Sequence, residues 1–180
     1  LPEVYPIYAA TFEASLPEGG AELLQLFSKS YLKLNTALAE RAPWTLAHQD
    51  YRVENMLFGN AENDEVTVID WQGIGRGPGV YDLAYLLGGS METELRRENE
   101  RDLVVAYHTE LCSNGVEGYS LDSLWADYGF AHLIGGLATS VFAGGTLDLN
   151  NERGKELITM MSERHVTAAL DHGGTGQIPN

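Results

Sequence analysis

One stretch of the chain, from His48 to Asp70, concentrates side chains that can handle a phosphate group. Within it, Asp50, Asn55 and Asp70 supply two carboxylates and one amide. These residue types at this spacing suit a metal-assisted phosphoryl transfer, in which one carboxylate orients a hydroxyl and the other groups hold Mg²⁺. Such chemistry requires the three side chains to meet, so the backbone between them must fold back on itself.

The backbone between Asn55 and Asp70 is predicted to fold back as a β-hairpin. Two short runs of β-forming residues flank the segment 59–64, which is rich in turn-forming residues. The simplest register places Leu57 opposite Val68, and therefore Asn55 opposite Asp70. Directly opposed residues of an antiparallel pair share a face, with Cβ atoms roughly 4.5–5.5 Å apart. The hairpin would thus bring two oxygen ligands together.

A single hard cation would suit these two oxygens. Mg²⁺ usually takes only one or two protein ligands and completes its coordination with water and substrate phosphates. Asp50 precedes the hairpin, which leaves it available as a base. Taken alone, Asp50 is equally typical of a turn or a helix cap, and Asn55 could satisfy local backbone groups. Asp70 is harder to explain without a cation or hydrogen bonds, because a charge is costly at the end of an apolar strand.

The same segment resembles the catalytic loop and metal-binding strand of the aminoglycoside phosphotransferase and choline kinase-like family, which has a protein-kinase-like fold. The resemblance covers roughly residues 44–90 most strongly. The matching residues are His48-x-Asp50, Arg52, Asn55, the triplet Ile69-Asp70-Trp71, and Gly79-Val-Tyr-Asp82-Leu-Ala. Gln49 departs from the pattern, because members of this group often have glycine at that position.

The resemblance implies a role for each matching residue. Asp50 would be the catalytic base, and Asn55 and Asp70 would bind Mg²⁺ and, through it, ATP. Arg52 falls where many kinases place a lysine that neutralises charge on the moving phosphoryl group. Asp82 would be structural and would brace the catalytic loop through backbone N–H groups. Arg52 also has a simpler alternative, as an ion partner of a neighbouring carboxylate.

Other polar and aromatic side chains have structural interpretations. His48 is expected to be a packed, hydrogen-bonded scaffold residue, because the adjacent carboxylate already fills the role of base. The stripe that contains Tyr81 and Tyr85 is typical of helix core. The remaining histidines are expected to lie far apart on predicted helices, so no metal site is predicted from them; they are His108, His132, His165 and His172.

Two nucleotide-binding features of kinase-like enzymes are missing from the sequence. Such enzymes cover the ATP phosphates with a glycine-rich loop and pair them with a strand lysine. No stretch of this chain matches G-x-G-x-x-G, and its lysines, Lys29, Lys33 and Lys155, lie in predicted helices. We therefore expect residues 1–180 to be a single domain, the C-terminal lobe of a phosphotransferase whose N-terminal nucleotide lobe is absent, and to turn over no ATP alone.

Composition restricts the partners. The 180 residues are 44% hydrophobic and 21% charged, which is enough apolar material for one folded domain. Their net charge of −15 argues against nucleic acid or an anionic membrane as partner and would favour a cationic acceptor, with Glu117, Asp122 and Asp127 as candidate contacts. A lone cysteine excludes an intrachain disulfide, and without an apolar leader or span the expected location is cytoplasmic.

The pattern of apolar residues predicts a mainly α fold with small β-hairpins (α+β). Residues 1–18, which include Pro2, Pro6 and Pro17, should be an extended N-terminal segment, and residues 173–180 a frayed tail. Apolar residues at helical spacing predict the helices between them. These helices should cover residues 21–41, 80–87, 93–113, 120–143 and 150–171.

Together these observations predict an ATP- and Mg²⁺-dependent phosphotransferase that acts on a hydroxyl of a small molecule. Two other classes remain open from the sequence. A non-catalytic, pseudokinase-type binding lobe would keep the fold without turnover. A metal-dependent phosphoesterase would also use Asp, Asn and His, but such sites generally need several histidines near their carboxylates, and only His48 is close here.

Overall fold

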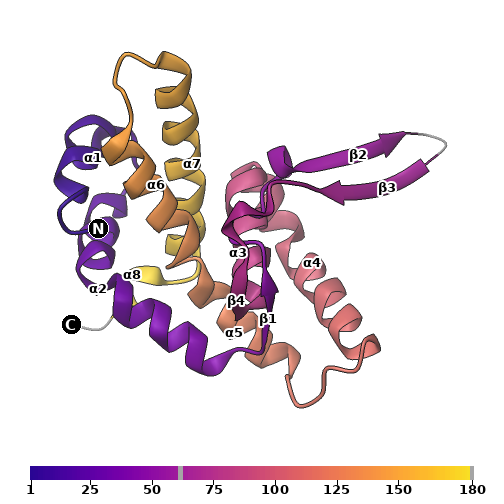
Figure 1. Ribbon diagram of the computed structural model, residues 1–180. Coiled ribbons are helices and arrows are strands. Elements are labelled where there is room, and N and C mark those ends of the chain that lie inside the picture. The colour runs from indigo at the N-terminus through magenta and orange to yellow at the C-terminus, as the bar shows by residue number, and fades with distance from the viewer. Residues whose placement is uncertain (61–62, 179–180) are drawn as a thin grey trace.

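A computed structural model describes residues 1–60 and 63–178, and it confirms the mainly α prediction: helices make up the body, with two small antiparallel sheets (Figure 1). The α-helices are α1 Tyr5–Phe12, α2 Gly20–Arg41, α3 Gly79–Ser90, α4 Thr93–Ser113, α5 Leu121–Ala131, α6 Gly135–Thr146, α7 Glu152–Asp171 and α8 Gly174–Gln177. The strands are β1 Trp44–Ala47, β2 Met56–Asn60, β3 Asn63–Val68 and β4 Gly75–Pro78. Three short 3₁₀ turns are η1 Glu13–Ser15, η2 Val53–Asn55 and η3 Trp71–Gly73.

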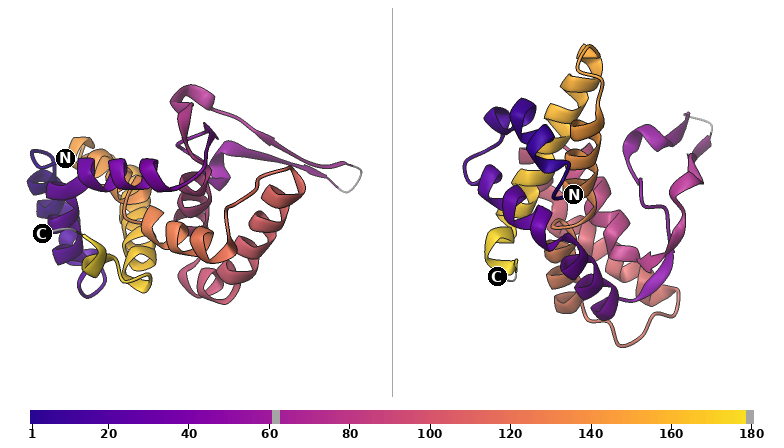
Figure 2. Two further views of the ribbon diagram at one scale, coloured as in Figure 1. Left: turned by 90° about the horizontal axis from the view of Figure 1, so that it is seen from below. Right: turned by 60° about the vertical axis from the view of Figure 1, so that its left-hand side comes forward.

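The hydrophobic core lies among the helices. Helix α2 buries Leu23, Leu24, Phe27, Leu34 and Leu38, which follow the spacing that predicted this helix from the sequence. Helices α1, α2, α6 and α7 gather on one side of the molecule, and the β2–β3 hairpin projects from the other (Figure 2). The helical body is therefore the support from which the hairpin and its adjoining loop extend.

The first residues are helical rather than extended, so the prediction of an extended segment over 1–18 was wrong. Pro6 lies in the first turn of α1, where no backbone N–H is needed and proline does not disturb the helix. Tyr8 and Phe12 are 0% and 2% exposed, and their rings stack with centroids 5.3 Å apart. Burial of these two aromatic rings explains why this segment folds onto the body.

The end of the chain also differs from the predicted frayed tail. Helix α8 follows α7 directly, and the Ile178 side chain is buried in the core. Gln177 Nε2 donates a hydrogen bond of 2.6 Å to the His172 carbonyl. The frayed tail predicted for 173–180 was thus wrong over 174–178, and its last two residues lie outside the described part of the chain.

The helix predicted over 120–143 is two helices. The predicted cap at its start is present, since the Ser120 hydroxyl accepts a hydrogen bond from the Ser123 N–H. The chain then turns between α5 and α6 and resumes at Gly135 and Gly136. A side chain at Gly136 would overlap the ring of His165 on α7, so this close approach requires glycine. The turn places His132 in the interior, 2% exposed.

The first sheet closes the base of the candidate loop. Strand β1 pairs antiparallel with β4, with Trp44 opposite Pro78 and Ala47 opposite Gly75. This pairing joins the two ends of the segment that contains the predicted catalytic residues. Backbone hydrogen bonds between β1 and β4 therefore anchor both ends of the segment.

The second sheet is the predicted β2–β3 hairpin, but its register differs by one residue. Met56 lies opposite Val68 and Leu57 opposite Thr67, so Leu57 does not pair with Val68 as predicted, and near the turn a bulge sets two residues of β3 against Gly59 of β2. A shift of one residue exchanges the two faces of a strand. The prediction that Asn55 lies opposite Asp70 was therefore wrong, since the backbone of Asn55 pairs instead with Ile69.

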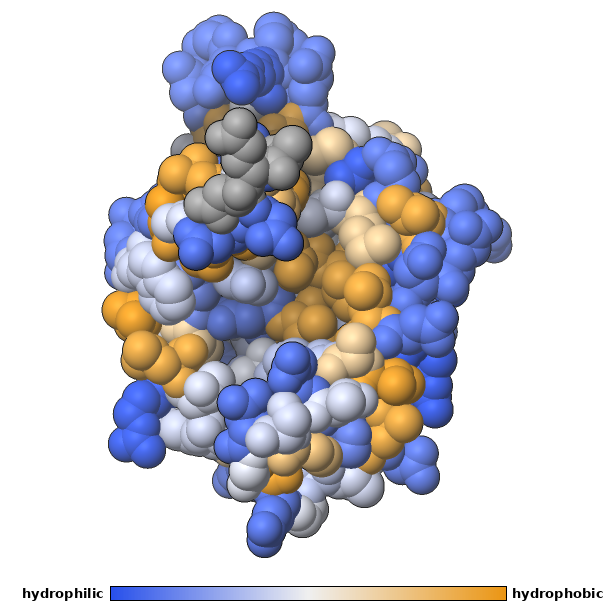
Figure 3. Space-filling model, turned by 90° about the vertical axis from the view of Figure 1, so that its right-hand side faces the viewer, coloured by the Kyte–Doolittle hydropathy of each residue, from blue (hydrophilic) through white to orange (hydrophobic). Residues whose placement is uncertain are grey.

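The hairpin leaves apolar side chains exposed. Leu57, Phe58 and Val66 are 56%, 62% and 50% exposed. Viewed from the side toward which the hairpin projects, apolar residues gather around a hollow in the middle of the face (Figure 3). Among residues 1–60 and 63–178, every helix is too short or too polar to cross a membrane.

Candidate active site

Helix α3 supports the candidate catalytic loop through the side chain of Asp82. The carboxylate of Asp82 accepts hydrogen bonds from the backbone N–H of His48, at 2.7 Å, and of Gln49, at 2.9 Å. Burial raises the pKa of Asp82, and these two N–H groups oppose that rise. The bracing role that the family resemblance implied for Asp82 is confirmed by these contacts.

His48 connects the loop to the strand that precedes Asp70. Its Nδ1 accepts a hydrogen bond from the Asp50 N–H, so the ring proton is on Nε2 and is donated to the Ile69 carbonyl, 2.9 Å away. The side chain is 1% exposed, and its ring packs against that of Trp71. The prediction that His48 is a packed scaffold residue is confirmed.

The Asp50 carboxylate is held from two sides. Asn55 Nδ2 donates to Asp50 Oδ2 at 3.0 Å and to the Asp50 carbonyl at 2.9 Å. On the other side, the Tyr85 hydroxyl donates to Asp50 Oδ1 at 3.1 Å. Because the amide nitrogen of Asn55 is committed to Asp50, its oxygen is the atom that could bind a cation. The structure therefore brings two of the three predicted side chains into direct contact.

Tyr85 is a site residue that the sequence did not reveal, because its spacing is that of ordinary helix core. It is buried on α3, and burial, with a further contribution from the charge of Asp50, raises its pKa to about 12. The hydroxyl therefore stays protonated and donates. Its position three residues after Asp82, on the same face of α3, is the signal that could have identified it.

Arg52 lies beside the same carboxylate. Its Nε is 3.4 Å from Asp50 Oδ1, which is an ion pair without the geometry of a hydrogen bond. The two side chains are 28% and 32% exposed. The structure thus contains the simpler pairing that the sequence allowed for Arg52, at a place where its charge also faces the candidate base.

Asp70 is set apart from the other two residues. It is exposed, and among the described residues it forms no hydrogen bond with Asp50 or Asn55. Two links place it near them: Ile69, its neighbour, donates its N–H to the Asn55 carbonyl at 2.9 Å and accepts from His48. Asp70 itself has a left-handed φ of 64°, which turns the chain directly after the strand. This turn, and not the hairpin register, sets the direction of its carboxylate.

Gln49 also has a left-handed backbone, with a φ of 68°. Glycine adopts this conformation without strain, whereas other residues pay of order 1–2 kcal/mol for it. The observation explains in physical terms why glycine suits this position in the family that the sequence resembles. The two left-handed residues, Gln49 and Asp70, stand at the two ends of the candidate site.

A groove of about 260 Å³ opens beside the loop. It is lined by Tyr31, Asn35, Ala39, Trp44, Ala47, Gln49, Arg76, Gly77, Pro78 and Tyr81. Tyr31 and Tyr81 also line a neighbouring hollow of about 340 Å³ along α6. All of these lining residues belong to the described chain, and none is acidic. Asp127, a predicted contact for a cationic acceptor, is instead buried and paired with Arg41 and Tyr119.

These features together define a class. A mainly helical body braces, through one helix, a loop whose carboxylate contacts an amide at the start of a hairpin, which is the arrangement expected for a kinase-like protein. The model of the ecdysteroid kinase-like family matches residues 8–115, which is more than half of the chain. The chain belongs to this kinase-like family, and its match includes Asp50, Arg52, Asn55, Asp70 and Asp82.

Two further comparisons gave no match. Neither the curated proteins nor the solved structures include one that matches this chain. The family model is consistent with the broader resemblance to choline kinase-like and aminoglycoside-phosphorylating enzymes that the motifs indicated. It does not assign the chain to either of those groups.

Proposed function

We propose that this chain carries the catalytic loop of an ATP- and Mg²⁺-dependent phosphotransferase that phosphorylates a hydroxyl of a small molecule. The observation that carries the proposal is the Asp50 carboxylate, held by Asn55 and Tyr85 in a loop that Asp82 braces. Membership of a kinase-like family supports it. Phosphoryl transfer demands mainly positioning and charge neutralisation from the protein, and this loop is built to position one carboxylate.

In this mechanism Asp50 orients the acceptor hydroxyl and takes its proton as the oxygen attacks the γ-phosphorus of ATP, while the bond from this phosphorus to the bridging oxygen of the β-phosphate breaks and ADP leaves. A positioned base of this kind typically contributes about 10²–10⁴ in rate. Arg52, which faces the same carboxylate, would neutralise charge on the phosphoryl group in transit. Asn55 Oδ1 and the Asp70 carboxylate would hold Mg²⁺ on the nucleotide phosphates, as the oxygen ligands that this ion prefers. The donor set fits the ion, although Asp70 must turn toward Asn55 to share it.

The groove beside the loop supplies a candidate acceptor site. Its aromatic side chains, Tyr31, Trp44 and Tyr81, suit a flat apolar molecule, and Asn35 and Arg76 can hydrogen-bond its polar groups. Without an acidic residue in its lining, the groove favours a neutral acceptor over the cationic one suggested by the net charge. The family's name refers to ecdysteroids, and an apolar molecule that carries hydroxyl groups is the acceptor class we propose.

The test is a coupled measurement of ADP formation by the natural protein that contains residues 1–180. ATP, Mg²⁺ and a panel of hydroxylated compounds, both steroid-like and cationic, would be supplied. We expect ADP formation that depends on one class of acceptor, together with a phosphorylated product identified by mass spectrometry.

The alternatives give different outcomes in the same assay. A non-catalytic lobe would bind nucleotide without forming ADP above the background of the Asp50→Asn variant. A phosphoesterase would release phosphate from an ester without ATP. Either result would contradict the proposed function.

A further inference from the structure

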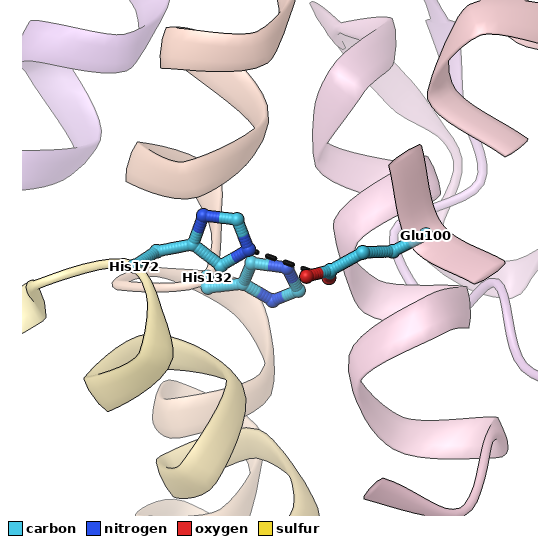
Figure 4. Close-up of side chains that lie close together, drawn as sticks. All are labelled: Glu100, His132 and His172. Atoms are coloured by element: carbon cyan, nitrogen blue, oxygen red, sulfur yellow. Dashed lines mark hydrogen bonds and ion pairs between the residues drawn. The ribbon is translucent and has the colours of Figure 1, made fainter. Parts of the chain in front are cut away.

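Two buried side chains and one partly buried side chain, from distant parts of the sequence, meet between the helices (Figure 4). Glu100 projects from α4, His132 from the turn after α5, and His172 from the end of α7. One ligand atom from each lies within 4.8 Å of the others. The prediction that the histidines lie far apart was therefore wrong for this pair, because the break between α5 and α6 turns His132 inward.

The His132 imidazole is buried at this cluster. It is 2% exposed, and neither ring nitrogen has a hydrogen-bond partner in the described part of the chain. A buried polar group without a partner is unusual and destabilising. Helix α3 makes room for the ring, since a side chain at Gly88 would lie 2.9 Å from His132 Nδ1.

Glu100 is oriented by its own partners. Its Oε2 accepts hydrogen bonds from Arg96 at 2.7 Å and from the Tyr128 hydroxyl at 2.9 Å, and lies 3.3 Å from His172 Nε2. Contacts of this kind orient metal-binding carboxylates from outside the coordination sphere. They also fix the Glu100 carboxylate next to both imidazoles.

The charges around the cluster leave room for a cation. Arg96 and Arg97 are surrounded by three carboxylates: both pair with Asp171, Arg96 also pairs with Glu100, and Arg97 with Glu94. These three carboxylates and two guanidinium groups together carry one more negative than positive charge. This excess negative charge would favour a divalent ion bound to Glu100. Arg96 competes with such an ion for the same carboxylate oxygen.

We propose that Glu100, His132 and His172 bind a zinc ion that ties α4 and α7 to the turn between α5 and α6. Two imidazoles and one carboxylate form a typical zinc donor set, whereas Mg²⁺ prefers oxygen alone. Ligand atoms of a tetrahedral zinc site lie about 3.4 Å apart, given bonds of about 2.1 Å. Side-chain movements of order 1 Å would close the present cluster onto the ion. The site is separate from the candidate active site and does not depend on the proposed function.

The test measures zinc binding to the tag-free chain after treatment with a chelator. Zinc would be titrated in excess Mg²⁺ against a chromogenic competitor, and Co²⁺ would be used as a spectroscopic probe of tetrahedral coordination. We expect one zinc per chain. His172→Gln and His132→Gln should each lower its affinity at least ~100-fold, since loss of a mere outer-shell partner can cost 10–100-fold. Circular dichroism would verify that each variant is folded.

Two control variants locate the ion. His108 lies on the same helix as Glu100, eight residues on, and near the exposed Cys112, with which it could bind zinc adventitiously. Both His108→Gln and Asp70→Asn should leave the affinity unchanged. The proposal is overturned if the wild-type chain takes up no zinc at micromolar concentration, whatever the variants do. It is also overturned if His108→Gln or Asp70→Asn, and neither cluster variant, abolishes binding.

Discussion

Replacement of Asp82 by alanine tests the support of the candidate catalytic loop. The carboxylate accepts two backbone N–H groups, from His48 and Gln49, at 2.7 and 2.9 Å. A hydrogen bond to a charged group contributes about 1.5–3 kcal/mol. Burial of Asp82, which raises its pKa, offsets part of this gain, so the lower end of the range applies to each bond. We expect Asp82→Ala to lower the free energy of unfolding by about 3 kcal/mol.

The two N–H groups should not contribute equally. His48 is 1% exposed, so its N–H cannot regain a bond to water, whereas Gln49 is exposed and its N–H can. In Asp82→Asn one oxygen remains to accept an N–H, and we expect a smaller loss. The assay is equilibrium unfolding in urea, with Asp102→Ala, at an exposed position of α4, as the matched control. A loss in Asp82→Ala no larger than that in Asp102→Ala would refute the bracing role.

Three further predictions concern the site and the core. Gln49 already bears the strain of its left-handed φ, so Gln49→Gly should raise the free energy of unfolding by about 1 kcal/mol, because glycine adopts this φ without strain. Gln49→Val should lower the free energy of unfolding, because a β-branched side chain suits a positive φ less than glutamine does; equal urea midpoints for the two variants would contradict this reasoning. Tyr85→Phe should reduce kcat roughly tenfold, because one hydrogen bond to Asp50 is lost, and should leave KM for ATP unchanged. Tyr81→Phe should instead alter KM for the acceptor, since Tyr81 lines the groove. The reverse pattern would remove Tyr85 from the site. Burial lowers the pKa of His165 to about 4, so as the pH falls below about 6.5 this histidine takes up a proton in the unfolded chain before it does in the folded one, and the folded state is destabilised between these values. The difference in the free energy of unfolding between wild type and His165→Gln should therefore shift by about 3 kcal/mol against wild type from pH 7 to pH 4. A constant difference would refute the buried neutral imidazole.

The sequence predicted the parts of the site that depend on local order along the chain. The hairpin, the scaffold role of His48 and the α2 helix follow from residue types, turn formers and apolar spacing, and the structure contains all three. The brace from Asp82 came from resemblance and is also present. These features involve few residues, so the chain specifies them locally.

Other features could not be predicted because they depend on tertiary packing. The strands pair with Leu57 opposite Thr67, one residue from the predicted register, and the left-handed backbone of Asp70 rather than this register sets the direction of its carboxylate. The contact between Tyr85 and Asp50 depends on how α3 is oriented relative to the loop. The meeting of His132 with His172 requires a helix break that close packing at Gly136 explains only once the neighbour is known.

The turnover of Asp50→Asn in the natural protein that contains this chain tests most directly whether Asp50 is the catalytic base. The change keeps the size of the side chain and an oxygen to accept from Tyr85, but removes the base. We expect a fall in kcat of at least about 100-fold, with nearly unchanged affinity for Mg²⁺-ATP. Turnover equal to that of wild type would contradict the assignment of Asp50 as the base.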